Sequence, residues 1–437
     1  MILLGALVLR LVLMPITMHS DLLFTNVFPH FLSSKGVWDI YGYFGDYYLA
    51  KEGHAYYAPL VYYLTGFAQS VLRPLNPGFN AFMEHTHRLM HDRLAGSIAD
   101  YLLPFSPAQR FRFVFMMKLP YLAAEGGCLF FITRIFKHSG RERERALFFW
   151  LWSPVLIFSI YIFGTYRIYP ALATWALIYF ALKDHKAWSA VCLGLLCLMD
   201  NFPWILFAPF ILMLGKDWRQ RAGLGFVALL VFGSVFIPLY FHSHGFAKYA
   251  YLAPVLTKAA SQGLTGGSSP EITLAVKAVF GFLYLGLLFK LLKHSRNSLK
   301  TMDISRRTEL VVWTSASVLL AFYASFQTLA HYFMWVLPFF VIIQAKGEPW
   351  KPAFTWALLT FLFLFNLDTR TLNWGLFIPL DPVYFLSKPS LHEVMDQWLP
   401  WGKVVAMARI LFSILCLEFV RRIFLLRIRP ILEGRAA

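Results

Sequence analysis

Residues 2–21 read ILLGALVLRLVLMPITMHSD, an apolar run that ends in a histidine, a serine and an aspartate. Residues 2–17 have the composition of a membrane-spanning helix, although the run is short for one. It lacks the basic start and the small-residue cleavage site of a signal peptide, so we expect it to be retained. A long polar segment at 18–110 follows, and Asp21 stands at its start. A carboxylate at the mouth of a helix bundle suggests chemistry at the boundary between lipid and water.

The composition of the chain is that of a membrane protein. Of its 437 residues, 58% are hydrophobic and only 14% are charged, and the mean hydropathy is +0.57. A soluble domain carries about 25% charged residues. We attribute the net charge of +17 to basic cytoplasmic loops, so nucleic acid is not an expected partner. The four cysteines lie in apolar runs without CxxC spacing, so we expect neither a disulfide nor a thiolate metal site.

Hydropathy predicts an all-α polytopic membrane protein with about eleven transmembrane helices in one domain, 1–437. The segment 187–214 is interrupted at 200–203 (Asp-Asn-Phe-Pro), which leaves open whether it forms one span or two short helices. The predicted spans after the first are 111–136, 146–163, 168–182, 187–214, 223–241, 272–292, 310–326, 332–344, 354–366 and 404–420.

The distribution of basic residues predicts the orientation, because loops rich in Lys and Arg stay in the cytoplasm. With the N-terminus inside, the segments 18–110, 242–270 and 367–403 face outward. This alternation requires residues 200–203 to be an outside turn. The inside loops then carry the basic residues at 134–145, 183–186, 216–221, 293–307, 346–351 and 421–429.

The large first outside loop, 18–110, contains aromatic stretches and a second carboxylate. Residues 36–41 read GVWDIY and include Asp39, and residues 56–60 read YYAPL. We expect 59–72 to lie along the membrane surface as an interfacial helix, since Trp and Tyr gather at that depth. Taken one at a time, these aromatic residues are better explained as anchors of the loop than as site residues.

Taken in order, several motifs resemble the GT-C superfamily, the multi-span glycosyltransferases that use polyprenyl-phosphate sugars. Two departures are Ala58, in place of the first proline of a Tyr-Pro-Pro-Leu-like motif, and Arg167, where many relatives have an acidic or amide residue. The second departure bears on donor or acceptor contacts. The motifs are His19-Ser20-Asp21, 36–41, 57–60, 117–120 with Glu125, 152–154, 163–170 and 331–338, and they cover the chain to about residue 345.

The resemblance implies an integral-membrane enzyme that transfers a sugar from a polyprenyl-phosphate donor to a lipid, glycan or protein hydroxyl on the exoplasmic face. The acceptor hydroxyl attacks the anomeric carbon and the lipid phosphate leaves, so a nearby carboxylate can act as general base. Asp21 matches the family position of that base, and Asp39 is the second candidate. A helix cap or a loop aspartate is the competing interpretation of Asp21.

Cations are expected near the leaving phosphate, where negative charge develops. Arg167 and His331 lie at predicted outside ends of helices, and Arg370 and Lys388 lie in the last outside loop. Each could equally be a solvated or headgroup-paired cation. The other predicted substrate contacts are His19, Tyr57, Lys118 and Tyr332.

Lys118 and Glu125 lie seven residues apart on one face of a predicted span. Ionisable residues at this depth usually face a cavity or a partner, so the two could pair with each other or with Arg10. The histidines at 85, 87 and 91 are better explained as a solvated segment than as a metal site. We therefore predict no metal and no cofactor beyond the lipid-linked sugar co-substrate, although a divalent ion is compatible with the superfamily.

Two other functions remain open. A lipid-linked sugar transporter or flippase would be expected to have paired broken helices at corresponding positions, but only 200–203 is broken. A glycan polymerase or ligase would have its large outside loop late in the chain rather than early. The compact loops favour a bacterial inner membrane, with the site facing outward, over the endoplasmic reticulum.

Overall fold

The computed structural model describes residues 2–44, 57–92, 97–243, 245–246, 270–295, 302–326, 330–346 and 372–433. Within these ranges every regular element is a helix, which confirms the predicted all-α class. The predicted span at 354–366 and the predicted site residue Arg370 lie outside the described residues.

The chain turns sharply after its first helix. α1 (Ile2–Ile16) and α2 (Ser20–Lys35) are bent by 79° relative to each other. His19 begins α2, because its backbone is extended and its ring Nδ1 accepts a hydrogen bond from the N–H of Asp21. The segment predicted to form the large outside loop therefore starts with a change of direction.

α2 ends at Gly36, whose φ of 67° is in the left-handed region and whose N–H donates to the carbonyl of Phe31. A residue with a Cβ is strained in that conformation, so glycine is the residue that suits this helix end. The expected interfacial helix is α5, which begins with a proline at its first position. The helices of this segment after α2 are α3 (Ile40–Phe44), α5 (Pro59–Leu72), η2 (Arg73–Leu75), α6 (Phe79–Asp92) and η3 (Ile98–Tyr101).

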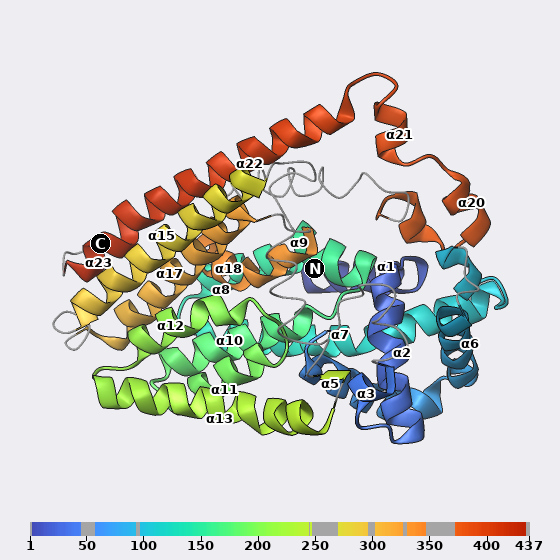
Figure 1. Ribbon diagram of the computed structural model, residues 1–437, viewed down its shortest axis with the longest axis horizontal. Helices are drawn as coiled ribbons and strands as arrows, with labels where there is room; N and C mark the ends of the chain where they lie inside the picture. Colours follow the sequence, from blue (N-terminus) through green and yellow to red (C-terminus); the bar gives the residue numbers. More distant parts are fainter. Residues whose placement is uncertain are drawn as a thin grey trace.

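The remaining helices form the main bundle. In Figure 1, α10, α11 and α13 lie next to one another, and α15, α17 and α22 form a second group of neighbours. The long helices are α7 (Pro107–Ile135), α13 (Trp218–His242), α15 (Pro270–Ser295), α17 (Ile304–Ser325) and α22 (Trp401–Ile423). The shorter ones are α8 (Gly140–Leu151), α9 (Pro154–Leu156), η4 (Ile157–Phe163), α10 (Ile168–Leu182), α11 (Lys186–Cys197), α12 (Pro203–Leu214), η6 (Ala330–Trp335), α18 (Leu337–Ala345), η8 (Trp374–Phe377), α20 (Pro382–Ser387), α21 (Leu391–Met395), η9 (Phe424–Ile428) and α23 (Arg429–Leu432).

Four helical stretches in the described part of the chain are long and apolar enough to cross a membrane. They are α7, Gly140–Phe163, α13 and α17, and α1 with α2 adds a fifth if the bent pair is one span. The most apolar part of α17 is 89% buried and that of α13 only 17%, so α17 lies in the bundle core and α13 at its periphery. This supports a helical membrane protein with four or five candidate spans rather than an established count of eleven.

The interrupted segment 187–214 consists of two short helices, α11 and α12, which run in opposite directions. The start of α11 and the end of α12 meet at one end of the bundle, where Lys186 Nζ lies 3.3 Å from Gln220 Oε1. At the same end Arg307 donates to the carbonyl of Leu214 over 3.3 Å. The residues at 200–203 therefore turn the chain at the opposite end, as the predicted orientation requires.

The predicted outside segments also meet at one end. The N–H of Met18 donates to the carbonyl of Leu376 over 2.7 Å, which joins the first segment to 372–400. The N–H of Leu60 donates to the carbonyl of Leu198 over 3.1 Å, which joins α5 to the turn after α11. In the described part of the chain, the contacts of Met18 and Leu60 and those of Lys186 and Arg307 thus lie at opposite ends of the helices.

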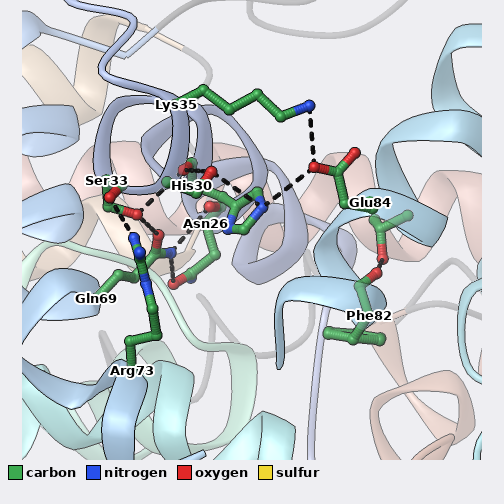
Figure 2. A network of polar contacts seen from close by, with 10 residues as sticks. Asn26, His30, Ser33, Lys35, Gln69, Arg73, Phe82 and Glu84 are labelled. Atoms are coloured by element: carbon green, nitrogen blue, oxygen red, sulfur yellow. Dashed lines mark hydrogen bonds and ion pairs between the residues drawn. The ribbon is translucent and has the colours of Figure 1, made fainter. Parts of the chain in front are cut away.

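Polar contacts fasten α2 to α5 (Figure 2). The Gln69 amide donates to the carbonyl and the side-chain oxygen of Asn26 over 2.9 and 3.0 Å. Arg73 donates to the carbonyl of Ser33, and the Ser33 hydroxyl lies 3.4 Å from Gln69 Oε1. Asn26 and Gln69 are buried, and buried amides are stable only when they are hydrogen-bonded. The network therefore fixes how these two helices pack.

A second set of contacts joins α2 to α6. Glu84 lies between Lys35, at 3.0 Å, and His30, at 3.8 Å, as Figure 2 shows. His30 is buried, whereas the Lys35 and Glu84 side chains are 46% and 40% exposed. The surface part of this network contributes little, because exposed ion pairs are worth at most about 1 kcal/mol.

The orientation can be tested with single cysteines at exposed positions. Asn80→Cys and Asn201→Cys should react with an impermeant thiol reagent in intact cells, because both positions are exposed and the charge pattern predicts both to be outside. Lys137→Cys and Arg219→Cys should react only after permeabilisation. The natural cysteines are all buried, so the unmodified protein serves as the blank. Labelling of Lys137→Cys but not Asn201→Cys in intact cells would invert the topology.

Candidate functional site

A cluster of polar and aromatic side chains lies at the end of the bundle where the first segment meets 372–400 and the turn after α11. It forms where α1 and η4 end, where α10 and α5 begin, and where the chain turns after α11. Six predicted site residues are among its members, together with three that the sequence did not indicate. The members are His19, Asp21, Tyr57, Tyr166, Arg167, Asp200, His331, Tyr332 and Trp335.

His19 and Asp21 form the corner between α1 and α2. The His19 ring stacks on the Phe163 ring, with the ring centroids 3.9 Å apart. The backbone N–H of His19 donates to the Phe163 carbonyl over 3.2 Å. Asp21 Oδ1 lies 3.4 Å from His19 Nδ1, and the Asp21 side chain is 28% exposed. The helix cap is therefore the histidine, and the Asp21 carboxylate stays available for another role.

Asp21 is held in its ionised form by its neighbours. Burial alone would raise the pKa of its carboxyl group. His19, His331 and Arg167 lower this pKa by a larger amount, so it lies below the usual range. The position in the first turn of α2 also favours a negative charge. A carboxylate that is ionised and partly exposed can accept a proton from a bound hydroxyl.

His331 lies beside the same phenylalanine as His19. Its ring is 4.8 Å from that of Phe163 and 4.6 Å from that of Tyr332, and the side chain is buried. Phe163 thus contacts two histidine rings that come from residues more than 300 positions apart in the sequence. Both imidazoles act electrostatically on Asp21.

Arg167 forms a buried ion pair with Asp200. Nη1 of Arg167 donates to Oδ2 of Asp200, and the two side chains are only 5% and 8% exposed. The same oxygen accepts from Nε1 of Trp335 over 3.0 Å. The guanidinium lies 4.0 Å above the Tyr332 ring, a cation–π contact that is strongest where water is excluded.

The position of Arg167 depends on Gly164, which ends η4 with a φ of 89°. This left-handed residue reverses the chain so that Arg167 reaches the start of α10. A Cβ at Gly164 would also lie 3.1–3.3 Å from the Leu22 side chain of α2. A glycine here therefore allows the Arg167 segment to pack directly against the helix that carries Asp21.

Tyr57 brings the start of α5 to the cluster. Its ring lies 4.8 Å from that of Tyr166, and its charge environment includes Asp21. Its carbonyl accepts from the Tyr41 hydroxyl over 2.6 Å, and its N–H donates to Tyr62 over 3.2 Å. Tyr57 is thus packed into the site with Tyr41 and Tyr62 behind it, and these three residues are more than surface anchors.

Lys118 lies beneath the His19–Asp21 corner with its ammonium group fully engaged. Nζ donates to the carbonyl and hydroxyl of Thr17, over 2.5 and 3.0 Å, and to the carbonyl of Tyr161, over 2.6 Å. An ammonium has three N–H donors, so none is left for a substrate. The predicted contact of Lys118 with substrate is replaced by a clamp between the ends of α1 and η4.

Glu125 pairs with Arg10, one of the two partners that the sequence left open. Nε and Nη2 of Arg10 donate to the two carboxylate oxygens over 2.6 and 2.7 Å, and the Tyr161 hydroxyl also donates to Glu125. Arg10 further donates to the carbonyls of Ala6 and Leu151, each over 2.9 Å. Every nitrogen of this guanidinium is therefore in use.

Two predicted site residues lie elsewhere. Asp39 caps α3, since its Oδ1 accepts from the N–H of Gly42 over 2.8 Å. Lys388 follows α20, and its Nζ lies 4.2 Å from the Tyr384 ring. Among the contacts described, none joins either residue to the cluster. No group of three metal-ligating side chains occurs in the described residues.

Asp200 is the functional candidate that sequence reasoning overlooked. Burying an aspartate among apolar helices costs free energy unless the carboxylate has a partner. This rule could have identified Asp200 as a paired or functional residue. The partner, Arg167, lies 33 positions earlier and was assigned to phosphate instead. Tyr166 and Trp335 were also overlooked, because isolated aromatic residues carry no such signal.

A comparison with models of known protein families finds no match, and a comparison with curated proteins finds no significant relative.

Loss of the Glu125 carboxylate should destabilise the protein strongly, because it leaves Arg10 charged and unpaired in the bundle. Breaking such a buried pair costs about 3–5 kcal/mol. We expect Glu125→Gln to lower the melting temperature of the purified protein markedly. Glu418→Gln is the matched control, since Glu418 pairs with Arg421 and Arg422 at the surface and should shift melting little. Equal shifts in the two variants would contradict a structural role for the buried pair.

Proposed function

We propose that the chain is an integral-membrane glycosyltransferase of the GT-C type. It moves a sugar from a polyprenyl-phosphate donor to a hydroxyl of a lipid, glycan or protein on the exoplasmic face. The proposal includes about eleven membrane crossings with the N-terminus inside, and a bacterial inner membrane as the location. The observation that carries it is that a partly exposed carboxylate, Asp21, and a buried cation, Arg167, belong to one cluster at the same end of the bundle.

The two charges suit the two halves of a glycosyl transfer. The acceptor oxygen forms a bond to the anomeric carbon while the bond from that carbon to the phosphate oxygen breaks. The hydroxyl proton passes to Asp21, and the polyprenyl phosphate leaves with one more negative charge than it had in the donor. A general base accelerates the first event, and a fixed cation such as Arg167 stabilises the charge that develops in the second.

The surroundings of the site support a lipid-linked substrate. α5 buries Tyr62, Thr65 and Gln69 on its inner face, whereas Phe67 and Val71 are 70% and 58% exposed. An exposed apolar stripe on a helix next to the site is typical of an element that lies in the membrane surface. A long isoprenoid chain could remain in the lipid while its phosphate reaches the cluster.

Asp21→Asn should lower turnover by about 10²–10⁴-fold while donor binding persists, because the amide cannot accept the proton. The measurement is transfer of label by the purified protein from a panel of radiolabelled polyprenyl-phosphate sugars to membrane lipid or glycan. Asp39→Asn is the matched control, since Asn caps a helix about as well as Asp and activity should survive.

The opposite pattern, an active Asp21→Asn and an inactive Asp39→Asn, would move the base to Asp39. Activity in both variants would remove the carboxylate mechanism altogether. Binding of the lipid-linked sugars by the wild type without transfer to any acceptor would favour the transporter alternative.

A further inference from the structure

The described part of the chain contains two buried arginine–carboxylate pairs that differ in how far the guanidinium is used. Arg10 meets Glu125 through two nitrogens and fills its remaining donors with backbone carbonyls. Arg167 meets Asp200 through Nη1 alone, and its buried Nε has no hydrogen-bond partner in the described part of the chain. A buried donor without a partner is costly, and such groups in native proteins call for an explanation.

Asp200 would stay stabilised if Arg167 turned toward another anion. Its Oδ2 accepts from Nε1 of Trp335 over 3.0 Å, and its Oδ1 accepts from the N–H of Asn201 over 2.8 Å. These neutral donors remain in place whether or not Arg167 is present. Glu125 also has a neutral donor, the Tyr161 hydroxyl, but it accepts two charge-assisted bonds from Arg10, whereas Asp200 accepts one from Arg167. The Arg167–Asp200 pair can therefore be opened at a lower cost than the Arg10–Glu125 pair.

We propose that Asp200 is an internal counter-ion that holds Arg167 in the empty site and shares or yields it to the phosphate of an incoming lipid-linked substrate. The phosphate as ligand rests on the proposed function. A phosphate can meet a guanidinium at two points, whereas Asp200 holds it at one, so the ligand can compete. A neutral lipid alcohol cannot displace a carboxylate from an arginine. Asp200 thus keeps Arg167 paired in the empty site and lowers the affinity for the phosphate, whereas the selectivity for a charged headgroup comes from Arg167.

The test measures binding rather than transfer. Purified full-length protein is titrated with undecaprenyl phosphate, with undecaprenol, and with inorganic phosphate, and the dissociation constants are compared. The wild type should prefer undecaprenyl phosphate to both other probes. Arg167→Gln should abolish the preference for the phosphate over the alcohol. Equal binding of inorganic phosphate and the lipid phosphate would overturn the lipid assignment of the ligand.

Asp200→Asn tests whether Asp200 competes with the phosphate for Arg167 or only holds Arg167 in position. Competition predicts that this variant binds undecaprenyl phosphate roughly tenfold more tightly, with undecaprenol binding unchanged. Positioning alone predicts weaker phosphate binding, as in Arg167→Gln, and that result or an unchanged affinity would overturn the proposal. The double variant Arg167→Gln/Asp200→Asn should bind like Arg167→Gln alone, because Asp200 acts only through Arg167.

Trp335→Phe provides a second route if Asp200→Asn does not fold. It removes the neutral donor from Asp200 and leaves Arg167 as the main partner of Oδ2, so phosphate binding should weaken severalfold. Unchanged binding in this variant would also contradict the proposal. Selective binding of the lipid phosphate without any sugar transfer would instead sink the proposed enzyme and leave the role of Asp200 standing.

Discussion

The requirement that buried charges be paired determines how the helices around the site are arranged. Arg10, Lys118 and Arg167 are all buried in a bundle whose surroundings are largely apolar. An unpaired ion there costs several kcal/mol, so each cation must meet oxygen atoms from another element. Arg10 thereby joins α1 to α7, Lys118 joins α7 to the ends of α1 and η4, and Arg167 joins the start of α10 to the turn after α11.

These connections place the candidate site at one position relative to the bundle. Lys118 bonds Thr17 and Tyr161, and the chain reaches Asp21 four residues after the first of these and Arg167 six residues after the second. Short connections from a rigid clamp leave little freedom for either charged side chain. The negative ends of two helices also face the ammonium group, which suits a lysine that has no carboxylate among its hydrogen-bond partners. Lys118 thus links the segment that carries Asp21 to the segment that carries Arg167.

The sequence predicted those features that depend on local patterns. Hydropathy predicted helices, and the motifs singled out Asp21, Tyr57, Arg167 and His331 as candidate site residues, which the fold brings into one cluster. Twelve-residue helices such as α11 and α12 are too short to be recognised as spans, so the number of crossings could not follow from length. The partners of Lys118 include two backbone carbonyls, which leave no trace in a sequence. Asp21 and Asp39 both stand near helix starts, and only tertiary packing separates the carboxylate that faces the cluster from the one that caps α3.

The two carboxylates of the cluster have environments that suit opposite tasks. Asp200 is 8% exposed and receives an arginine, an indole N–H and a backbone N–H, so its charge is balanced within the protein. Asp21 is 28% exposed and has the His19 side chain at close range, while Arg167 acts on it through space. A base must exchange protons with a ligand, which requires access and unused oxygen lone pairs, whereas a counter-ion must stay ionised and fixed, which requires burial and several donors. Under the proposed function, the unequal burial therefore favours Asp21 for proton transfer and Asp200 for control of Arg167, and exchanging the two roles would leave the base inaccessible and the arginine unbalanced.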